Sequence, residues 1–459
     1  MSPASPPATT REVGGRPSPS PAGGRPAREG WHLPQVLIYA GLFLASSDRL
    51  LAVNFGSLTL KPSYVFFSAA LWFVLTRNVL RPIRVVGTPI PGFGVAVILL
   101  LAVNVVAGCF GVSAKLTIQQ LVTIFGGAVV PFLCVAFGLT SRVQLERGIS
   151  AWILGTLAAA TFGFYQFAAP YLGLPQGLEY SGLAAGLGRI SAWSYEPAFY
   201  AYHLELALAI VVKDVLTRHR RFGVMPELVA LFLIANLILT NARAAYLSFP
   251  ILVILVMRAV AGRQRLDRRA FRVIRLVVAS AAVILVLGVP LGINLPKYVV
   301  TRVQSVTNTQ EIESNALRLE LYDVEVELLR QRPWLGYGPG NIGLYLADRL
   351  PMFRGIDPHA IVANNLILQT ALDAGIVSIP IVMAVIWTLY RASRRSPSVD
   401  ARVLLAGVSA ILFVNSMLVS LFWDMRLWVV IGLAYAAARV AIRTPPDVPP
   451  TRGAALRPG

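Results

Sequence analysis

The stretch GFGVAVILLLAVNVVAGCF, from Gly92 to Phe110, carries no charged side chain. A helix rises by about 1.5 Å per residue, so a helix of this length crosses the hydrocarbon core of a bilayer. A comparable apolar run extends from Arg272 to Ile293. Runs of this length and composition predict transmembrane α-helices.

The composition of the whole chain agrees with this prediction. Of 459 residues, 56% are hydrophobic and only 14% are charged, and the mean hydropathy is +0.65. A soluble domain of this size needs more charge to cover its surface. The fold class is therefore predicted as all-α integral membrane, with about twelve transmembrane helices. The expected spans lie near residues 33–53, 62–76, 92–110, 115–138, 148–170, 193–215, 223–240, 243–261, 272–294, 362–390, 400–422 and 425–443.

The net charge of +19 comes from basic residues that gather in short connections between the spans. These residues include Arg77, Arg81, Arg84, Arg142, Arg147, Lys213, Arg218, Arg220, Arg221, Arg258, Arg263, Arg265, Arg268, Arg269, Arg391, Arg394 and Arg395. Each of these connections follows an even-numbered span, and basic connections of membrane proteins stay in the cytoplasm. We therefore expect a multi-pass protein of the bacterial inner membrane with both termini in the cytoplasm. Nucleic acid is not needed to explain the charge.

Both ends of the chain are expected to lie outside the membrane domain. Residues 1–30 are rich in Pro, Gly, Ser and Arg and lack the short apolar core of a cleavable signal, which predicts a disordered cytoplasmic tail. A polytopic membrane domain over 31–443 and a cytoplasmic tail over 444–459 follow. Cys109 and Cys134 lie in apolar runs without metal-ligand spacing, so we interpret them as packing residues.

Two of the connections predicted to face outward are long. The first ends in GLGRISAWSYEP at residues 186–197, and the second covers 295–361, which is too long for a simple connector. Within the second, apolar side chains follow helical spacing from Ser314, a candidate cap, to Arg330. Pro333 ends the pattern and a glycine-rich turn follows. The large extracytoplasmic loop is thus expected to contain an amphipathic helix along the membrane surface.

Charged side chains near the outer ends of the spans are the candidate functional residues. An ionisable group within a span costs about 2.5–3.5 kcal/mol, so each one needs a reason. Arg189, Glu196 and Arg243 occupy outward connections, and arginines that converge there suit a diphosphate, since the guanidinium group matches phosphate oxygens. Glu196 is the first candidate for a general base, with partial burial expected to raise its pKa.

Other charged side chains have simpler interpretations. Arg426 and Asp424 are expected to form a structural ion pair, and Arg349 and Arg354 to be solvated. His203 is expected to pair with Glu205 or with a neighbouring helix. The run from Asp323 to Glu327 resembles a metal cluster but is more simply a solvated helix face. We expect neither a metal nor another cofactor.

His359, between Pro358 and the tenth expected span, is the second candidate for the general base. Its position at the expected membrane boundary is compatible with a role in the site, but a lone histidine more often has a structural role.

Several motifs in residues 235–390 occur together in the order expected of one family. The turn Asn241-Ala-Arg-Ala-Ala opens a helix, and an arginine precedes an aromatic residue from Arg318 to Tyr322. The turn PWLGYGPGN, residues 333–341, and NNLILQTALDAG, residues 364–375, follow. In this order they resemble the O-antigen ligase and O-antigen polymerase superfamily, which are membrane glycosyltransferases.

The resemblance implies a glycan donor carried by a polyprenyl diphosphate such as undecaprenyl diphosphate, a glycan or lipid-core acceptor, and the bilayer as surroundings. Arg318 becomes a third candidate for diphosphate binding, after Arg189 and Arg243. A regulator of chain length is a candidate partner. In register, Asn364 occupies the place of the histidine attributed to the ligases, which favours a polymerase of O-antigen or exopolysaccharide. An O-antigen ligase or a protein O-oligosaccharyltransferase is the alternative.

A flippase or other transporter of lipid-linked glycans is the main alternative outside the enzymes. Such a protein would need cations at the membrane midplane and on both sides. The candidate arginines here are confined to the outward side, and no internal repeat is evident. The sequence therefore favours an enzyme over a transporter or a structural scaffold.

Overall fold

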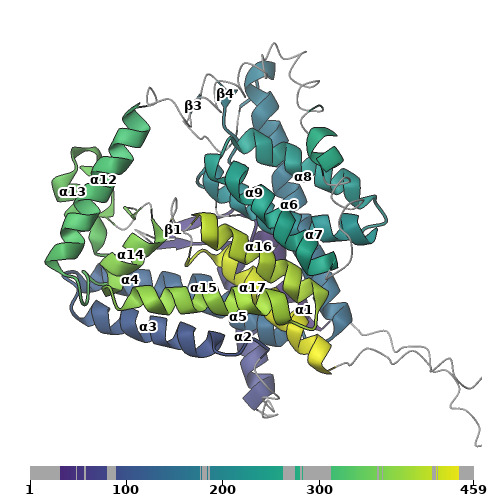
Figure 1. The fold of residues 1–459 in the computed structure, drawn as a ribbon, viewed down its shortest axis with the longest axis horizontal. Helices are drawn as coiled ribbons and strands as arrows, with labels where there is room; N and C mark the ends of the chain where they lie inside the picture. Colours follow the sequence, from purple (N-terminus) through teal and green to yellow (C-terminus); the bar gives the residue numbers. More distant parts are fainter. Residues whose placement is uncertain are drawn as a thin grey trace, which may run out of the picture. The chain divides into compact units, whose positions relative to one another are not determined.

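The computed structural model describes residues 32–47, 49–55, 58–79, 89–175, 177, 183–184, 187–261, 274–279, 282, 312–358, 361–363, 365–415, 420 and 422–443. Within them helices predominate (Figure 1). The first half contains α1 (Leu33–Leu44), β1 (Val53–Phe55), β2 (Leu58–Leu60), α2 (Pro62–Val79), α3 (Phe93–Cys109), α4 (Ala114–Ile124), a π-helix (Phe125–Val129), α5 (Val130–Gly138), α6 (Arg142–Ala168), a 3-10 turn (Ala169–Leu172), β3 (Leu183–Ala184), β4 (Leu187–Gly188), α7 (Pro197–Thr217) and α8 (Pro226–Thr240). The second half contains α9 (Arg243–Ala261), α12 (Ile312–Gln331), α13 (Ile342–Arg349), a 3-10 turn (Pro351–Phe353), α14 (Leu366–Ala374), α15 (Ser378–Arg395), α16 (Val399–Asn415) and α17 (Met425–Arg443).

Most of the expected spans coincide with helices of the structure. Among the described residues, three stretches of helix are long and apolar enough to cross a membrane: Ala114–Gly138, Arg142–Leu172 and Met425–Arg443. Shorter apolar helices accompany them, and the chain is an all-α membrane protein in its described part. The span expected near 272–294 lies largely outside the described residues.

The first expected span is shorter in the structure than the sequence suggested. α1 ends at Leu44, and the chain turns through Ala45 to Ala52 instead of continuing to residue 53. β1 and β2 then form a small antiparallel hairpin in which Val53 pairs with Leu60. Polar and charged side chains at 46–49 end the apolar run, which explains the early turn.

The expected span over 362–390 is divided into α14 and α15. Gly375 separates the two helices with a φ of 80°, which favours glycine. A Cβ atom at Gly375 would lie 1.8 Å from the Trp334 carbonyl oxygen, so the segment that carries Trp334 packs directly against the break. The apolar pattern continues through the break, so hydropathy alone did not reveal it.

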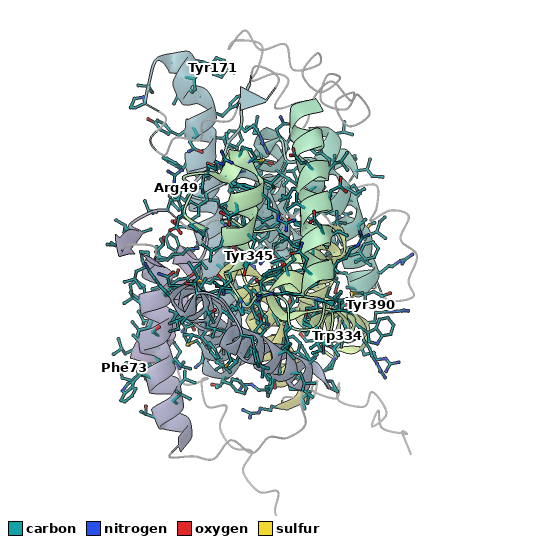
Figure 2. All side chains as sticks on the ribbon, turned by 90° about the vertical axis from the view of Figure 1, so that its left-hand side faces the viewer. Arg49, Phe73, Tyr171, Trp334, Tyr345 and Tyr390 are labelled. Atoms are coloured by element: carbon teal, nitrogen blue, oxygen red, sulfur yellow. The ribbon has the colours of Figure 1, made fainter. Side chains whose placement is uncertain are left out.

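α7 is the most completely buried helix of the core. Its side chains are buried from Tyr200 to Leu216, and the helix contacts α6, α8, α9 and α16. α16 in turn contacts α9, α15 and α17 (Figure 1). In Figure 2 the labelled Phe73 and Tyr171 lie at the periphery, in agreement with their exposure of 38% and 39%. An interior this apolar agrees with a membrane domain.

Connections that were predicted to face outward meet at one end of α7, called here the Glu196 end. The Trp193 carbonyl accepts a hydrogen bond from the Arg49 backbone N–H at 3.0 Å. The Ile190 N–H donates to the Leu239 carbonyl at 3.5 Å. These contacts join the α1–α2 connection and the end of α8 to the segment before α7, as the alternating direction of the predicted spans requires.

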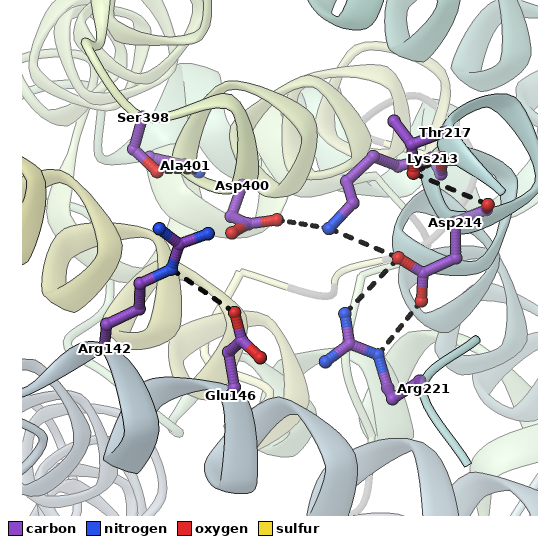
Figure 3. A network of polar contacts seen from close by, with 9 residues as sticks. All are labelled: Arg142, Glu146, Lys213, Asp214, Thr217, Arg221, Ser398, Asp400 and Ala401. Carbon is purple, nitrogen blue, oxygen red and sulfur yellow. Dashed lines mark hydrogen bonds and ion pairs between the residues drawn. The ribbon is translucent and has the colours of Figure 1, made fainter. Parts of the chain in front are cut away.

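The opposite end of α7, called the Lys213 end, carries a network of ion pairs (Figure 3). Lys213 Nζ lies 2.5 Å from Asp400 Oδ1 and 3.2 Å from Asp214 Oδ1. Arg221 Nε lies 3.0 Å from Asp214 Oδ2. The network fastens the start of α16 and the α7–α8 connection to α7, at span ends that were predicted to face the cytoplasm.

The amphipathic helix predicted in the large loop is confirmed as α12. It begins at Ile312, two residues before the predicted start, so Ser314 lies inside the helix rather than at its cap. Leu321 and Leu328 are buried and pack in a cluster with Leu346 of α13. The acidic run is only partly solvated, because Asp323 and Glu327 are exposed whereas Glu325 is buried.

Candidate functional site

The predicted residues Arg189 and Glu196 begin and end a segment that is held by several helices. Inside it, the Ala192 N–H donates to Gln166 Oε1 of α6 at 2.7 Å. The Ser194 hydroxyl accepts a hydrogen bond from Arg426 Nη1 of α17 at 2.8 Å. Together with the contacts of Ile190 and Trp193, these bonds hold the segment in one position at the Glu196 end. A binding site needs residues that are held rigidly in this way.

Arg189 lies against the turn that leads into α9. Its Nε donates to the Thr240 carbonyl at 3.4 Å, and Asn241 in the same turn has a φ of 53°. Arg243 follows as the first residue of α9. The backbone that carries Arg243 is therefore close to Arg189, and the Arg243 side chain lies outside the described part.

Glu196 is the N-cap residue of α7, and Pro197 occupies the first helical position. The carboxylate side chain is exposed, which corrects the expectation of partial burial. The cause is local: Glu196 ends an outward connection and precedes the buried part of α7, whose apolar side chains begin after it. An exposed carboxylate at this position is accessible to a substrate from the Glu196 end.

Arg426 and Asp424 form the expected structural ion pair. Arg426 Nη2 lies 2.8 Å from Asp424 Oδ2, and Arg426 Nε donates to Asp424 Oδ1 at 2.9 Å. The guanidinium group also stacks over the ring of Tyr202, 4.9 Å from the centroid. Burial by itself would raise the pKa of Asp424, but the Arg426 charge and hydrogen bonds, with a further effect of Lys61, hold it well below its usual range.

Arg49 and Lys61 also reach the candidate site, and the sequence analysis did not single them out. The Arg49 guanidinium carbon and Lys61 Nζ each lie 5.9 Å from the ring centroid of Tyr195, next to Glu196 (Figure 2 labels Arg49). Both residues flank the first outward connection. Their cationic charge on the side where basic residues are disfavoured is the sequence signal that could have identified them.

The remaining predicted residues belong to the large loop. Arg318 lies in α12, but its side chain is outside the described part, and so is His359. The preceding residue, Pro358, packs tightly on α13, where a Cβ atom at Gly343 would lie 1.9 Å from its carbonyl oxygen. Asn365 caps α14 by accepting hydrogen bonds from the N–H groups of Ile367 and Leu368 at 2.8 and 3.2 Å.

Two of the loop motifs pack directly on each other. In the turn 333–341, the Tyr337 and Gly338 N–H groups donate to the carbonyls of Leu372 and Asp373 at 2.7 and 3.0 Å. The Asp373 carboxylate accepts from Gln369 Nε2 at 2.8 Å and from the Gly340 N–H. The glycine turn and the Gln369–Asp373 pair therefore form one structural clamp that joins the loop to α14.

Asn341 extends this clamp to the α3–α4 connection. Its Oδ1 accepts the Ser113 N–H at 2.8 Å, and its Nδ2 donates to Thr117 Oγ1 at 2.8 Å. Asn341 is fully buried. The loop is thus fixed to a second pair of helices, α3 and α4. This attachment sets the orientation of the side chains on α12 and α13.

Loop charges outside the clamp differ in their surroundings. Arg349 is exposed, as expected, and its Nη1 also lies 2.6 Å from Glu327 Oε1, which is exposed as well. The contact arises from the approach of α13 to the exposed face of α12. Arg354 is exposed, as expected.

Inside the core, α7 carries two buried polar groups that tie it to neighbouring helices. His203 Nε2 lies 3.0 Å from Thr156 Oγ1 of α6, and its ring makes an edge contact with Trp152. Glu205 Oε1 accepts a hydrogen bond from the Ser248 hydroxyl of α9 at 2.6 Å. His203 therefore pairs with a neighbouring helix, one of the two expected alternatives, and Glu205 pairs with another.

The loop motifs and the turn at Arg243 coincide with a match to known proteins. Residues 228–382 match the family model described as O-antigen ligase. A search of curated proteins found no match. The matched segment begins in α8 and includes the turn beside Arg189, the helix α12, and both halves of the clamp between 333–341 and α14. The match over this segment supports the resemblance to the O-antigen ligase and O-antigen polymerase superfamily that the sequence motifs indicated.

Proposed function

We propose that the protein is a metal-independent glycosyltransferase, which moves a glycan from a polyprenyl-diphosphate carrier to a sugar hydroxyl on the outer face of the membrane. The family supports membrane glycosyl transfer. The observation that carries the proposal is the contact of Arg189 with the α8–α9 turn. That contact brings an arginine from outside the matched segment to the turn that presents Arg243 within it.

The proposed topology determines which end of the protein lies at the outer face of the membrane. In it the chain has about twelve spans over residues 31–443, with cytoplasmic tails at 1–30 and 444–459. The Glu196 end faces outward and the Lys213 end faces the cytoplasm of a bacterial cell. The basic residues near the Lys213 end, including Arg218, Arg220 and Arg221, support this orientation.

The proposed reaction forms one bond and breaks one. The acceptor hydroxyl oxygen attacks the anomeric carbon of the donor, and the bond from that carbon to the diphosphate oxygen breaks. Polyprenyl diphosphate leaves with both electrons of that bond. Negative charge accumulates on its oxygens, and the fixed guanidinium groups of Arg189, Arg243 and Arg318 would stabilise it.

The acceptor's proton needs a base. Glu196 is our first choice, because its carboxylate is exposed at the end of a segment that several helices hold in place. His359 is the second choice. We favour a polymerase over a ligase, since Asn364 replaces the ligase histidine in the motif.

The first experiment is complementation of a strain that lacks the gene. Wild type, Arg189→Ala, Arg243→Ala, Glu196→Gln and His359→Ala are compared at equal membrane levels, with the exposed loop residue in Arg354→Ala as the matched control. We expect the Arg189 and Arg243 variants to accumulate single lipid-linked repeats while Arg354→Ala restores polymer. Full polymer from both arginine variants would contradict the proposal.

A further inference from the structure

The α7–α8 connection, residues 218–225, carries basic side chains on the outside of the Lys213 end. α7 ends where Arg218 adopts a φ of 57°, and the His219 N–H then donates to the Asp214 carbonyl at 2.9 Å. The chain turns away from the helix at this point, and Arg218, His219 and Arg220 are exposed. Pro226 is the first residue of α8. Exposed cations are therefore concentrated between the end of α7 and the start of α8.

A cavity of about 270 Å³ lies beside these cations. It is lined by Arg218, Arg220, Met225, Pro226 and Glu227. Within the described part of the chain, neither arginine side chain forms an ion pair or a hydrogen bond, with Glu227 or with any other residue. The lining therefore has a surplus of positive charge. Guanidinium groups match the oxygens of a phosphate, and the volume is below the range of about 300–1,000 Å³ that is usual for larger organic ligands. The cavity suits a small group that carries a phosphate.

A buried guanidinium group beside this cavity has an unsatisfied donor. The Arg221 side chain is only 7% exposed, and its Nε and Nη2 bond to the two carboxylate oxygens of Asp214 (Figure 3). Its Nη1 has no hydrogen-bond partner in the described structure, which is costly for a buried donor. Arg221 lines a second cavity of about 10 Å³, close to the space of one water, and Pro226 borders both cavities. A phosphate oxygen, or a water bound to it, is the kind of acceptor that Nη1 lacks.

Exposed apolar side chains border the same connection. Val224, Met225 and Leu228 are 45%, 54% and 55% exposed, and Met225 also lines the larger cavity. A free phosphate ion gains nothing from apolar neighbours, whereas a phospholipid has acyl chains next to its phosphate. Basic side chains beside exposed apolar ones are typical of segments that lie in the interface of an anionic membrane. These surroundings favour a phosphate that belongs to a lipid.

Other basic residues that were predicted to be cytoplasmic lack this combination. Arg142 is paired with Glu146 at 3.5 Å. Arg394 and Arg395 are exposed in the last turn of α15, but they line neither of the two cavities. These two arginines have the same charge and the same predicted side of the membrane as Arg218 and Arg220, so they are a matched control.

We propose that Arg218, Arg220 and Met225 bind the phosphate headgroup of an anionic phospholipid in the leaflet at the Lys213 end. The proposed topology assigns this leaflet to the cytoplasmic side, where anionic lipids attract basic segments. The two arginines bind the phosphate, Met225 contacts the start of an acyl chain, and Arg221 adds a buried positive charge beside them. The site takes no part in glycosyl transfer, and the inference does not depend on the proposed activity.

The test uses the purified full chain in neutral detergent, with bound lipid counted by native mass spectrometry. Phosphatidylglycerol is titrated into wild type, the double variant Arg218→Gln/Arg220→Gln, the single variant Arg220→Gln and the control Arg394→Gln/Arg395→Gln. Phosphatidylcholine tests the need for net negative charge, and inorganic phosphate as a competitor tests the need for a lipid. Thermal unfolding without lipid shows whether each variant is folded.

We expect the double variant to bind phosphatidylglycerol about tenfold or more weakly than wild type, because charge-assisted hydrogen bonds to the phosphate are lost. Arg220→Gln should lose part of this affinity, and the control should bind as wild type does. Phosphatidylcholine should bind wild type more weakly and all variants equally, and inorganic phosphate at the same concentration should displace little phosphatidylglycerol.

Four results would overturn the site. They are an equal loss of affinity in the control, phosphatidylcholine binding as tight as that of phosphatidylglycerol, displacement by an equal concentration of inorganic phosphate, and no saturable binding to wild type. If the double variant is unfolded, Arg220→Gln decides, and wild-type affinity in that variant would also overturn the site. Because lipid binding is measured without donor or acceptor, none of these results depends on whether the protein is a transferase.

Discussion

The Ser248 hydroxyl of α9 donates a hydrogen bond to Glu205 Oε1 of α7 at 2.6 Å, and both side chains are fully buried. Ser248 lies five residues after Arg243, which begins α9, and Glu196 caps the start of α7. The bond therefore sets the relative position of the two helices that carry a proposed diphosphate ligand and the proposed base. A contact inside the core thus influences how Arg243 and Glu196 are placed at the Glu196 end.

Removal of the Ser248 hydroxyl should loosen this link. In Ser248→Ala the buried carboxylate loses its donor, which costs about 1–3 kcal/mol. Glu205→Gln keeps an acceptor oxygen for Ser248 and should be close to wild type. Thermal unfolding in detergent measures both. The control is Thr161→Ala, which removes an exposed hydroxyl that bonds within its own helix. An equal loss of stability in Thr161→Ala would contradict a special contribution of the Ser248–Glu205 bond.

The Arg426–Asp424 pair should be far more sensitive. Asp424→Asn leaves a buried guanidinium without its charge partner, and loss of one member of a buried pair costs about 3–5 kcal/mol. We expect little folded protein in the membrane. Glu146→Gln breaks the exposed Arg142–Glu146 pair at 3.5 Å and should cost at most about 1 kcal/mol. Similar amounts of folded protein for Asp424→Asn and Glu146→Gln would show that Asp424 contributes no more to stability than a surface charge does.

The pH dependence of the Asp424 contribution follows from the sign of its pKa shift. The folded pKa is lowered, so the stabilisation is fully present above the unfolded value of about 3.9 and is lost as pH falls through the lower folded pKa. The stability difference between wild type and Asp424→Asn should be constant from pH 8 to about 5 and shrink only below about 4. A difference that shrinks near neutral pH would contradict this.

The clamp between the glycine turn and α14 predicts an asymmetry between two glycines. Gly375 and Gly355 both have positive φ, 80° and 81°, but only at Gly375 would a Cβ meet another atom, the Trp334 oxygen at 1.8 Å. Gly375→Ala should detach the loop and increase its proteolysis. Gly355→Ala has open space and should lose only about 1 kcal/mol. Equal protease sensitivity of the two variants would refute the clamp.

The sequence predicted the positions of the helices better than the residues at which helices end or break. Apolar runs gave the positions of α3, α8, α9 and α17 because burial in lipid and burial in protein both demand long apolar stretches. The break at Gly375 escaped notice, since its cause is a contact with Trp334 far away in the chain. The early end of α1 was missed for a related reason, as the hairpin that follows is itself apolar at Val53 and Leu60.

At the candidate site, the sequence predicted Arg189, Arg243 and Glu196 because they interrupt apolar stretches on the predicted outer side. It missed Arg49 and Lys61, whose importance depends on their approach to Tyr195, a residue about 140 positions later. The roles of Gln369 and Asp373 were also hidden. The sequence analysis assigned them no role, and only their contacts with Gly340 and each other identify a structural clamp.

The most direct measurement is the release of polyprenyl diphosphate from a lipid-linked repeat by the purified chain in liposomes with EDTA present. The account predicts steady release by wild type and by Arg354→Gln. Arg189→Gln should be slower by about a hundredfold or more, as expected when a charge stabiliser of the transition state is removed. Release at the wild-type rate by Arg189→Gln, or none by folded wild type, would contradict the account.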